Sequence, residues 1–136
     1  MHIEHIAVWV EDLEGMRAFY EEYFDATSND RYENPKKSFS SYFLTLPGEG
    51  ARVELMHFPE VPVNPFRDNL STVPGEQFTG FIHFALSLGS KEAVLSLTER
   101  LRADGHKVIG EPRTTGDGYF ESVVLDPEGN MIELTE

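Results

Sequence analysis

The hydrophobic residues of this chain follow the period of a strand, then that of a helix, then that of a strand again. Alternation over residues 3–10 predicts a strand, and apolar residues at helical spacing over residues 13–24 predict a helix. Asp12 belongs to the residue types that cap helix N-termini, and it stands directly before this helix. Alternation then returns over residues 38–46 and 51–58, which are predicted to be strands joined by a turn containing proline and glycine.

A second set of elements follows in the same order. Residues 81–88 alternate as a strand, and residues 91–103 are a predicted helix with Ser90 as its N-cap and Gly105 as its stop signal. Three further strands are predicted at residues 107–109, 119–125 and 130–135. Between the two sets, residues 59–80 contain four prolines and are predicted to be an irregular linker, long for an ordinary connection.

The repeated order predicts an α+β fold made of two βαβββ modules, one over about residues 1–58 and one over about 81–136. At 136 residues the chain has the length of a single domain, so the two modules are expected to share it. Each helix is expected to cover one face of its sheet. The uncovered faces of the two sheets would then form a curled mixed sheet around a central cavity.

Composition narrows the classes of partner. A net charge of −13 argues against nucleic acid and anionic membranes, because their phosphates would be repelled. No cysteine is present, so a bound metal would have histidine and carboxylate ligands. The first residues do not show the basic and then apolar segment of a secretory signal, and no stretch reaches the about 20 apolar residues needed to cross a bilayer. A cytoplasmic location is therefore expected.

Histidine and glutamate recur at matching places in the two modules. His5 and Glu54 are 49 positions apart, and His83 and Glu133 are 50 positions apart. In alternating strands all four belong to the faces that no helix covers. Each residue alone could be an ordinary solvated strand residue, but the matched spacing predicts a divalent metal held between the modules. Glu121 is a further acid nearby, and it is expected to be an ordinary surface residue.

Several motifs carry a resemblance to a known family. The chain opens with His5-Ile6-Ala7-Val8, continues with Asp12-Leu13 and Phe19-Tyr20, and closes with Asp126-Pro127-Glu128-Gly129-Asn130-Met131-Ile132-Glu133-Leu134. These motifs resemble the vicinal oxygen chelate superfamily, also called the glyoxalase/bleomycin resistance/dioxygenase fold. The resemblance covers essentially all 136 residues.

Within this superfamily, the order His5, Glu54, His83, Glu133 is similar to the ligand set of glyoxalase I. The resemblance implies that these residues bind one divalent metal ion: Zn²⁺, Ni²⁺, Co²⁺, Mn²⁺ or Fe²⁺. It implies a lyase or isomerase acting on a small α-hydroxycarbonyl or hemithioacetal-type substrate through an enediolate. Glu133 would be the catalytic base, and Glu54 the candidate on the opposite side. Two alternatives stay open: a non-catalytic small-molecule or drug-binding protein of bleomycin-resistance type, and a metal-dependent dioxygenase.

Three aromatic residues are expected to contact the substrate. Bacterial glyoxalase I carries an arginine four positions after the first histidine ligand and an asparagine four positions after the first glutamate; this chain has Trp9 and Phe58 there. Together with Phe81, these side chains suit a more aromatic or apolar small molecule than glutathione. Members of this fold often pair modules within one chain or across a dimer, so a homodimer is also expected.

Overall fold

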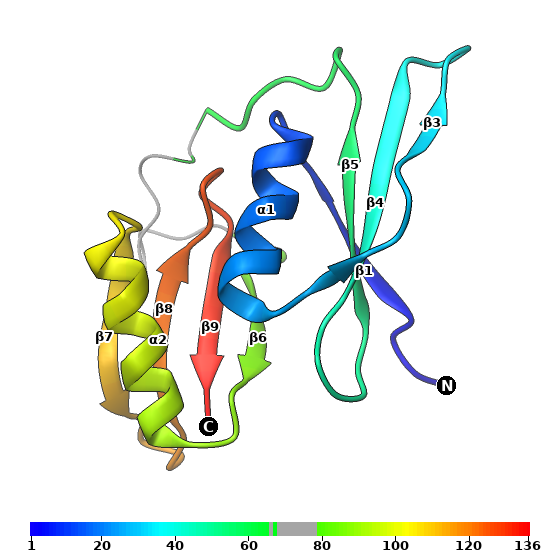
Figure 1. The fold of residues 1–136 in the computed structure, drawn as a ribbon. Coiled ribbons are helices and arrows are strands. Elements are labelled where there is room, and N and C mark those ends of the chain that lie inside the picture. Colours follow the sequence, from blue (N-terminus) through cyan, green and yellow to red (C-terminus); the bar gives the residue numbers. More distant parts are fainter. Residues whose placement is uncertain (66, 68–78) are drawn as a thin grey trace. The chain divides into compact units, whose positions relative to one another are not determined.

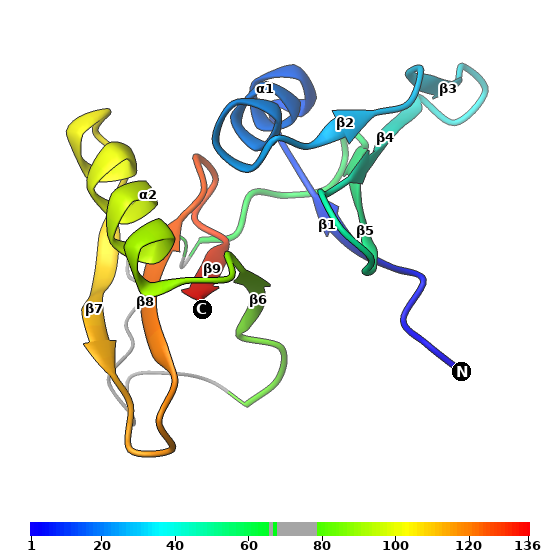
Figure 2. The ribbon, with the colours of Figure 1, turned by 60° about the horizontal axis from the view of Figure 1, so that its bottom comes forward.

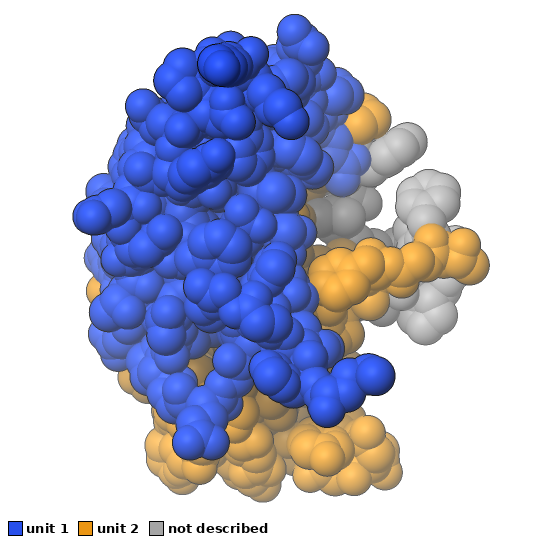
Figure 3. All heavy atoms as spheres, turned by 90° about the vertical axis from the view of Figure 1, so that its right-hand side faces the viewer, with its two compact units in different colours: residues 1–64 blue, residues 65–136 orange. Residues whose placement is uncertain are grey.

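The structure is a computed structural model, and it describes residues 1–65, 67 and 79–136. The chain folds as two compact units, residues 1–64 and 65–136, which are coloured separately in Figure 3. Each unit contains one helix and one mixed sheet, so the predicted α+β fold of two modules is confirmed. The predicted linker, residues 59–80, lies partly outside the described residues. The union of both modules in one domain around a shared cavity stays a prediction.

In the first unit, a helix packs on one face of a five-stranded sheet (Figures 1 and 2). Its elements are β1 (His5–Trp9), α1 (Leu13–Phe24), β2 (Thr27–Ser28), β3 (Tyr32–Asn34), β4 (Phe39–Thr45) and β5 (Arg52–His57). The strand order is β1-β5-β4-β2, and β3 also pairs with β4. β1 and β5 are parallel, and the other pairs are antiparallel.

Helix α1 begins at Leu13 because Asp12 caps it. The Asp12 carboxylate accepts a hydrogen bond from the Gly15 N–H at 2.9 Å, which satisfies a donor that has no partner inside the helix. The apolar stripe of the helix is buried against the sheet and consists of Leu13, Met16, Phe19, Tyr20 and Phe24. The helix ends where Asp25 adopts the left-handed conformation, with a φ of 51°. The predicted bounds of this helix are confirmed.

The second unit repeats this arrangement with a four-stranded sheet. Its elements are β6 (His83–Ser87), α2 (Lys91–Ala103), β7 (Val108–Thr114), β8 (Phe120–Leu125) and β9 (Met131–Thr135). The strand order is β6-β9-β8-β7, with β6 and β9 parallel, and α2 packs against β7, β8 and β9 (Figure 2). Strand by strand this order matches that of the first unit, as expected for a duplication. In the part of the chain that the structure describes, neither helix is long and apolar enough to cross a membrane.

Helix α2 is bounded by the two signals that the sequence predicted. Ser90 Oγ accepts a hydrogen bond from the Ala93 N–H at 3.2 Å. At the other end Gly105 has a φ of 91°, a conformation that glycine adopts without steric cost. The N–H groups of Gly105 and His106 then donate back to carbonyls of the last helical turn. Both bounds of the predicted helix 91–103 are confirmed.

A single buried carboxylate organises the turn between β8 and β9, residues 126–129. Asp126 Oδ1 accepts hydrogen bonds from the N–H groups of Glu128 and Asn130, at 3.0 and 2.8 Å. Its Oδ2 accepts a third bond, from the Asn130 side-chain amide, at 2.8 Å. Gly129 has a φ of 83° and closes the turn with a backbone bond to the Asp126 carbonyl. The predicted hairpin turn is confirmed, and the Asp126 side chain stabilises it.

Two short strands and the length of a third were not predicted. β2 and β3 contain two and three residues and are largely polar, so they show no hydrophobic alternation. β7 was predicted to end near residue 109, but it continues to Thr114 past Pro112. It is an edge strand, where a residue without an N–H is tolerated, and its pairing with β8 shifts register twice.

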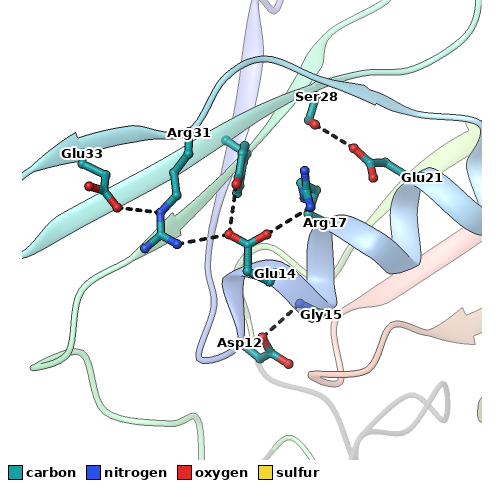
Figure 4. A network of polar contacts seen from close by, with 9 residues as sticks. Asp12, Glu14, Gly15, Arg17, Glu21, Ser28, Arg31 and Glu33 are labelled. Carbon is teal, nitrogen blue, oxygen red and sulfur yellow. Dashed lines mark hydrogen bonds and ion pairs between the residues drawn. The ribbon is translucent and has the colours of Figure 1, made fainter.

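Polar contacts connect the region of β2 and β3 to α1 (Figure 4). Ser28 Oγ donates to Glu21 at 2.6 Å. Arg31, between the two strands, lies 3.1 Å from the Glu14 carboxylate and 3.0 Å from that of Glu33. Such contacts depend on side chains that are distant in sequence, which explains why alternation alone did not predict these strands.

Candidate metal centre

Each sheet has one face covered by its helix, and we call the other its open face. In the first unit, β1 pairs with β5 so that Ala7 lies opposite Glu54. Residues two apart in a strand share a face, so His5 and Trp9 lie on the open face together with Glu54. The alternate residues of β5, Val53 and Leu55, are buried on the helix side. The predicted face of these residues is therefore confirmed.

His5 and Glu54 form a diagonal pair across β1 and β5. His5 Nε2 lies 3.8 Å from Glu54 Oε2, and the two side chains are 39% and 14% exposed. This separation is longer than a hydrogen bond, so the two atoms are neighbours without bonding directly. Ala7, the register partner of Glu54, contributes only a methyl group beside the carboxylate.

The second unit repeats this pair in the same register. Ala85 lies opposite Glu133, and His83 lies two residues before Ala85 on β6. His83 Nε2 is 3.4 Å from Glu133 Oε2, with side chains 38% and 19% exposed. The duplication therefore preserves the diagonal, the ring nitrogen that faces the carboxylate, and the small residue beside it.

Both separations fit two ligands of one metal ion. Ligand atoms about 2.1 Å from an ion lie between roughly 2.9 and 4.2 Å apart when the angle at the ion is between about 90° and 180°. The distances in the His5–Glu54 and His83–Glu133 pairs fall in this range. Among residues 1–65, 67 and 79–136, no group of three or more His, Asp or Glu side chains is gathered to hold a metal ion. Each unit thus supplies a pair, and the four-residue centre stays a prediction.

Aromatic side chains occupy much of the open face of the first unit. Trp9 is 47% exposed and contacts Phe39 edge-on, with ring centroids 6.2 Å apart. Tyr32 contacts Phe39 from the other side at 6.1 Å. Phe43 lies opposite Glu54 on β4 and packs edge-on against His5 at 5.3 Å. Of this group only Trp9 was predicted, because the pairing of β3 with β4 is not visible in the hydrophobic pattern.

The other two predicted substrate contacts lie at strand ends. Phe58 directly follows β5 and is half-buried. Phe81 was predicted to begin a strand over residues 81–88, but β6 begins at His83. Phe81 is outside the strand and 78% exposed. The contact of either residue with a substrate stays a prediction.

The open face of the second unit carries another acid, Glu121. It lies opposite Thr135 on β9, two residues from Glu133, and so shares the face of Glu133. Its side chain is only 13% exposed and lies 3.3 Å from Arg113 Nη2. The expectation that Glu121 is an ordinary surface residue is therefore wrong. Burial does not alternate along β8, so the face of Glu121 could not be assigned without the pairing of β8 with β9.

The neighbours of Glu121 change the pKa of its carboxyl. Burial raises the pKa of the Glu121 carboxyl, and the nearby Glu133 carboxylate raises it further, while Arg113 acts in the opposite direction. Two acids on one face repel each other when both are ionised. A divalent ion held at Glu133 would offset this repulsion, so the residues present fit the group that the donor set implies.

His5 has a second carboxylate neighbour on its other ring nitrogen. Its Nδ1 lies 2.5 Å from Glu4 Oε2. Glu4 also pairs with Arg52, whose guanidinium lies over the Phe43 ring at 4.3 Å from the centroid. The hydrogen bond with His5, and then that with Arg52, lowers the pKa of Glu4 below its ordinary value. Glu4 was not predicted, because its position next to a histidine in sequence does not show which side chains it contacts.

Comparison with known proteins gives one family and several similar structures. The model of the Glyoxalase/Bleomycin resistance protein/Dioxygenase superfamily matches residues 2–134. Among curated proteins, no sequence matches the chain.

Three solved structures illustrate the structural similarity. A glyoxylase/bleomycin resistance protein/dioxygenase domain from Frankia sp. EAN1pec is 21% identical, with a TM-score of 0.78 over 99% of this chain and 96% of that one. The trypanothione-dependent glyoxalase I of Leishmania major is 20% identical, with a TM-score of 0.75 over 100% and 86%. Glyoxalase I from Zea mays is 25% identical, with a TM-score of 0.74 over 98% of this chain. The chain spans 44% of the length of the maize enzyme.

Proposed function

Because the chain belongs to the Glyoxalase/Bleomycin resistance protein/Dioxygenase superfamily, we propose that it is a metal-dependent lyase or isomerase of glyoxalase I type. Its substrate would be a small α-hydroxycarbonyl or a hemithioacetal-type compound. The observation that carries this proposal is the same His–Glu diagonal in both units, with Nε2 facing the carboxylate at 3.8 and 3.4 Å. A duplicated pair of this kind has no obvious use in a sheet that only needs to fold.

In this proposal His5, Glu54, His83 and Glu133 hold one divalent ion, such as Zn²⁺, Ni²⁺, Co²⁺, Mn²⁺ or Fe²⁺. Two neutral imidazoles and two carboxylates balance the charge of the ion and are ligand types that all of these metals accept. When bound, the ion supplies Lewis-acid stabilisation of the negative charge that develops on substrate oxygen as a proton leaves the adjacent carbon.

The chain's own residues would move that proton. Glu133 takes the proton from the carbon next to the carbonyl and returns it to the carbonyl carbon, while the hydroxyl proton passes from one substrate oxygen to the other, so no external oxidant or reductant is needed. Glu54 is its counterpart in the first unit and is the candidate for the opposite side of the substrate. Both carboxylates are largely screened from solvent, at 14% and 19% side-chain exposure, which favours proton transfer to substrate over exchange with bulk water.

The aromatic open face of the first unit supports a substrate with an apolar portion. Trp9 presents a half-exposed ring two residues from Ala7, the register partner of Glu54. Phe58 and Phe81 are the further proposed contacts. A charged tripeptide such as glutathione would find no cation or amide at the positions of Trp9 and Phe58, so a more apolar substrate is favoured.

Metal analysis tests the proposal most directly. The purified protein is expected to carry about one divalent ion per four-residue centre, and added Ni²⁺ or Zn²⁺ is expected to raise its thermal unfolding temperature. His5→Ala and His83→Ala should each lose this stabilisation, whereas His2→Ala, at an exposed position, should keep it. A wild-type protein that neither carries nor responds to a divalent metal would contradict the proposal.

The aromatic surface also supports a second candidate function, that of a non-catalytic small-molecule binder. The contacts among Trp9, Phe39 and Tyr32 could hold a flat ligand without any metal. Ligand binding that is unchanged by chelators and by His83→Ala would favour this function. Oxygen uptake with a catechol and Fe²⁺ would instead favour a dioxygenase.

We also propose that the protein is a homodimer, since modules of this superfamily pair within or between chains. Size-exclusion chromatography with light scattering tests this, and a monomer at every concentration would contradict it. A cytoplasmic location stays a prediction.

A further inference from the structure

We infer that Glu4 is a positioning residue, which sets the tautomer and the orientation of His5 so that Nε2 is available to a divalent cation beside Glu54. This inference rests on the proposed metal site and adds to it a residue that does not itself bind the metal. It is carried by contacts within the first unit alone.

The contact with Glu4 determines which ring nitrogen of His5 carries the proton. Nδ1 lies 2.5 Å from Glu4 Oε2, and an ionised carboxylate can only accept a hydrogen bond. The proton of the contact therefore lies on Nδ1. In the neutral imidazole the other nitrogen, Nε2, then carries a lone pair and no proton.

The other ring nitrogen of His5, Nε2, faces the Glu54 carboxylate. It lies 3.8 Å from Glu54 Oε2, beyond hydrogen-bond distance. A bare ring nitrogen and a carboxylate oxygen are both electron-pair donors, and neither can satisfy the other. A cation between them would accept an electron pair from each. The tautomer with its proton on Nδ1, which the contact with Glu4 favours, is therefore the one that metal binding requires.

Contacts with Arg52, and through it with Phe43, hold Glu4 in place. Glu4 and Arg52 form an ion pair, and the Arg52 N–H donates to the Glu4 carbonyl at 3.0 Å. The Arg52 guanidinium lies over the ring of Phe43, whose centroid also lies 5.3 Å from that of His5. One phenyl ring thus supports both the histidine and the arginine that anchors its carboxylate. The orientation of His5 is fixed by Glu4 and Phe43 together.

Among the described residues of the second unit, the corresponding positions differ. The register that pairs His5 with Arg52 pairs His83 with Met131, and the residue before His83 is Ile82. Neither replacement can accept a proton from a ring nitrogen or anchor a carboxylate. The two histidines are therefore unequal: His5 has a carboxylate directly before it in sequence, and His83 has Ile82 there.

The test compares Glu4→Ala and Glu4→Gln with wild type in two measurements on the full chain. The first is the affinity for Zn²⁺ and Ni²⁺ by titration calorimetry, and the second is the pair of His5 ring ¹⁵N shifts in the metal-free protein. We expect Glu4→Ala to weaken metal binding by about 10-fold and to lose the preference for a proton on Nδ1. Glu4→Gln keeps a hydrogen-bond acceptor, so its metal affinity and its preference for a proton on Nδ1 should lie between those of wild type and Glu4→Ala.

The matched control is Glu49→Ala, which removes the same charge from the exposed turn between β4 and β5. It should leave both measurements unchanged, which separates a local contact from the general effect of net charge. If the wild type binds metal and Glu4→Ala binds it equally well, the inference is overturned but the proposed function is not. Absence of metal binding by the wild type would overturn both.

Discussion

The hydroxyl groups of Thr98 and Ser122 lie 2.7 Å apart, at a fully buried position where α2 packs on β8. Thr98 Oγ1 also lies 2.6 Å from the Val94 carbonyl, which can only accept. Thr98 therefore donates to Val94 and accepts from Ser122. This chain of bonds joins the helix to the sheet on the side away from the candidate metal centre.

Replacing Thr98 by Val keeps its shape but leaves the Ser122 hydroxyl buried without its acceptor, at an expected cost of about 2 kcal/mol of unfolding free energy. Ser122→Ala removes only the donor and should cost about 1 kcal/mol. The double variant should be destabilised by less than the sum, because neither hydroxyl is then left without a partner. Urea unfolding of all four proteins measures the coupling, and strict additivity would contradict it.

Tyr42 should make the first unit sensitive to alkaline pH. Its ring is buried, its hydroxyl donates to Glu14 at 2.9 Å, and burial, followed by Glu14, raises the pKa of the phenol above 10.0. A raised folded pKa means that the fold binds this proton more tightly than the unfolded chain does. The resulting stability is fully present below the unfolded pKa and is lost as the pH rises through the folded one.

Tyr42→Phe should therefore remove part of the loss of stability seen above about pH 10. At neutral pH the same change should cost about 1 kcal/mol, because one hydrogen bond is lost. Unfolding free energies measured across the alkaline range for both proteins give the difference directly. A wild type and a variant with parallel pH curves would contradict the assignment.

Gly129 should tolerate alanine less well than Gly118 does. Both have positive φ, 83° and 97°, so an alanine at either position is expected to cost about 1 kcal/mol. At Gly129 the new Cβ would also lie 2.9 Å from the Arg67 carbonyl oxygen, whereas nothing lies within 4 Å of one at Gly118. Gly129→Ala should thus destabilise the protein by about 1 kcal/mol more than Gly118→Ala in urea unfolding. Equal losses would show that the contact with Arg67 is relieved at no cost.

Trp9 is the only tryptophan of the chain, and its fluorescence should report on the proposed site. It is half-exposed on the same open face as Glu54, so an aromatic ligand bound there is expected to quench or shift its emission. Trp9→Ala should weaken the binding of such a ligand by about 10-fold, and it should also lower stability, since the half-buried ring packs on Phe39. Calorimetry of the variant checks the affinity. Tight binding with no change in emission would place the ligand elsewhere.

The two glutamates of the proposed centre should differ in kinetics. Glu133→Gln removes the proposed base and should lower kcat by about 10²- to 10⁴-fold, whereas Glu54→Gln should lower it less. Turnover of a panel of hemithioacetals and α-hydroxycarbonyls measures this, with the metal content of each variant determined alongside. A larger loss for Glu54→Gln at equal metal content would reverse the assignment of the base.

The helices could be predicted to the residue because short-range chemistry determines their ends. Asp12 and Ser90 each cap a helix with a side-chain oxygen, and Gly105 ends the second helix. The strands β2 and β3 could not be predicted, because they pair with β4 through polar residues and show no alternation. The extension of β7 depends likewise on its place at the edge of the sheet.

The candidate site was partly predictable for a related reason. Alternation placed His5 and Glu54 on one face, and the distance between them follows from the pairing of β1 with β5. Glu121 and Glu4 were missed, because their importance depends on cross-strand neighbours and on a contact between side chains. Sequence patterns show which face a residue occupies, and pairing shows which side chains it meets there.

The turn at residues 126–129 has a consequence for the chemistry of the strand that follows it. Because Asp126 fixes this turn through three hydrogen bonds, it sets the alternation of β9 from its first residue. A slip of β9 by one residue against β8 would turn Ile132 outward and Glu133 toward the helix, and the fixed turn opposes such a slip. The four turn residues, none of which is a proposed catalytic residue, thus help to determine whether β9 presents Glu133 or a hydrocarbon side chain to a ligand.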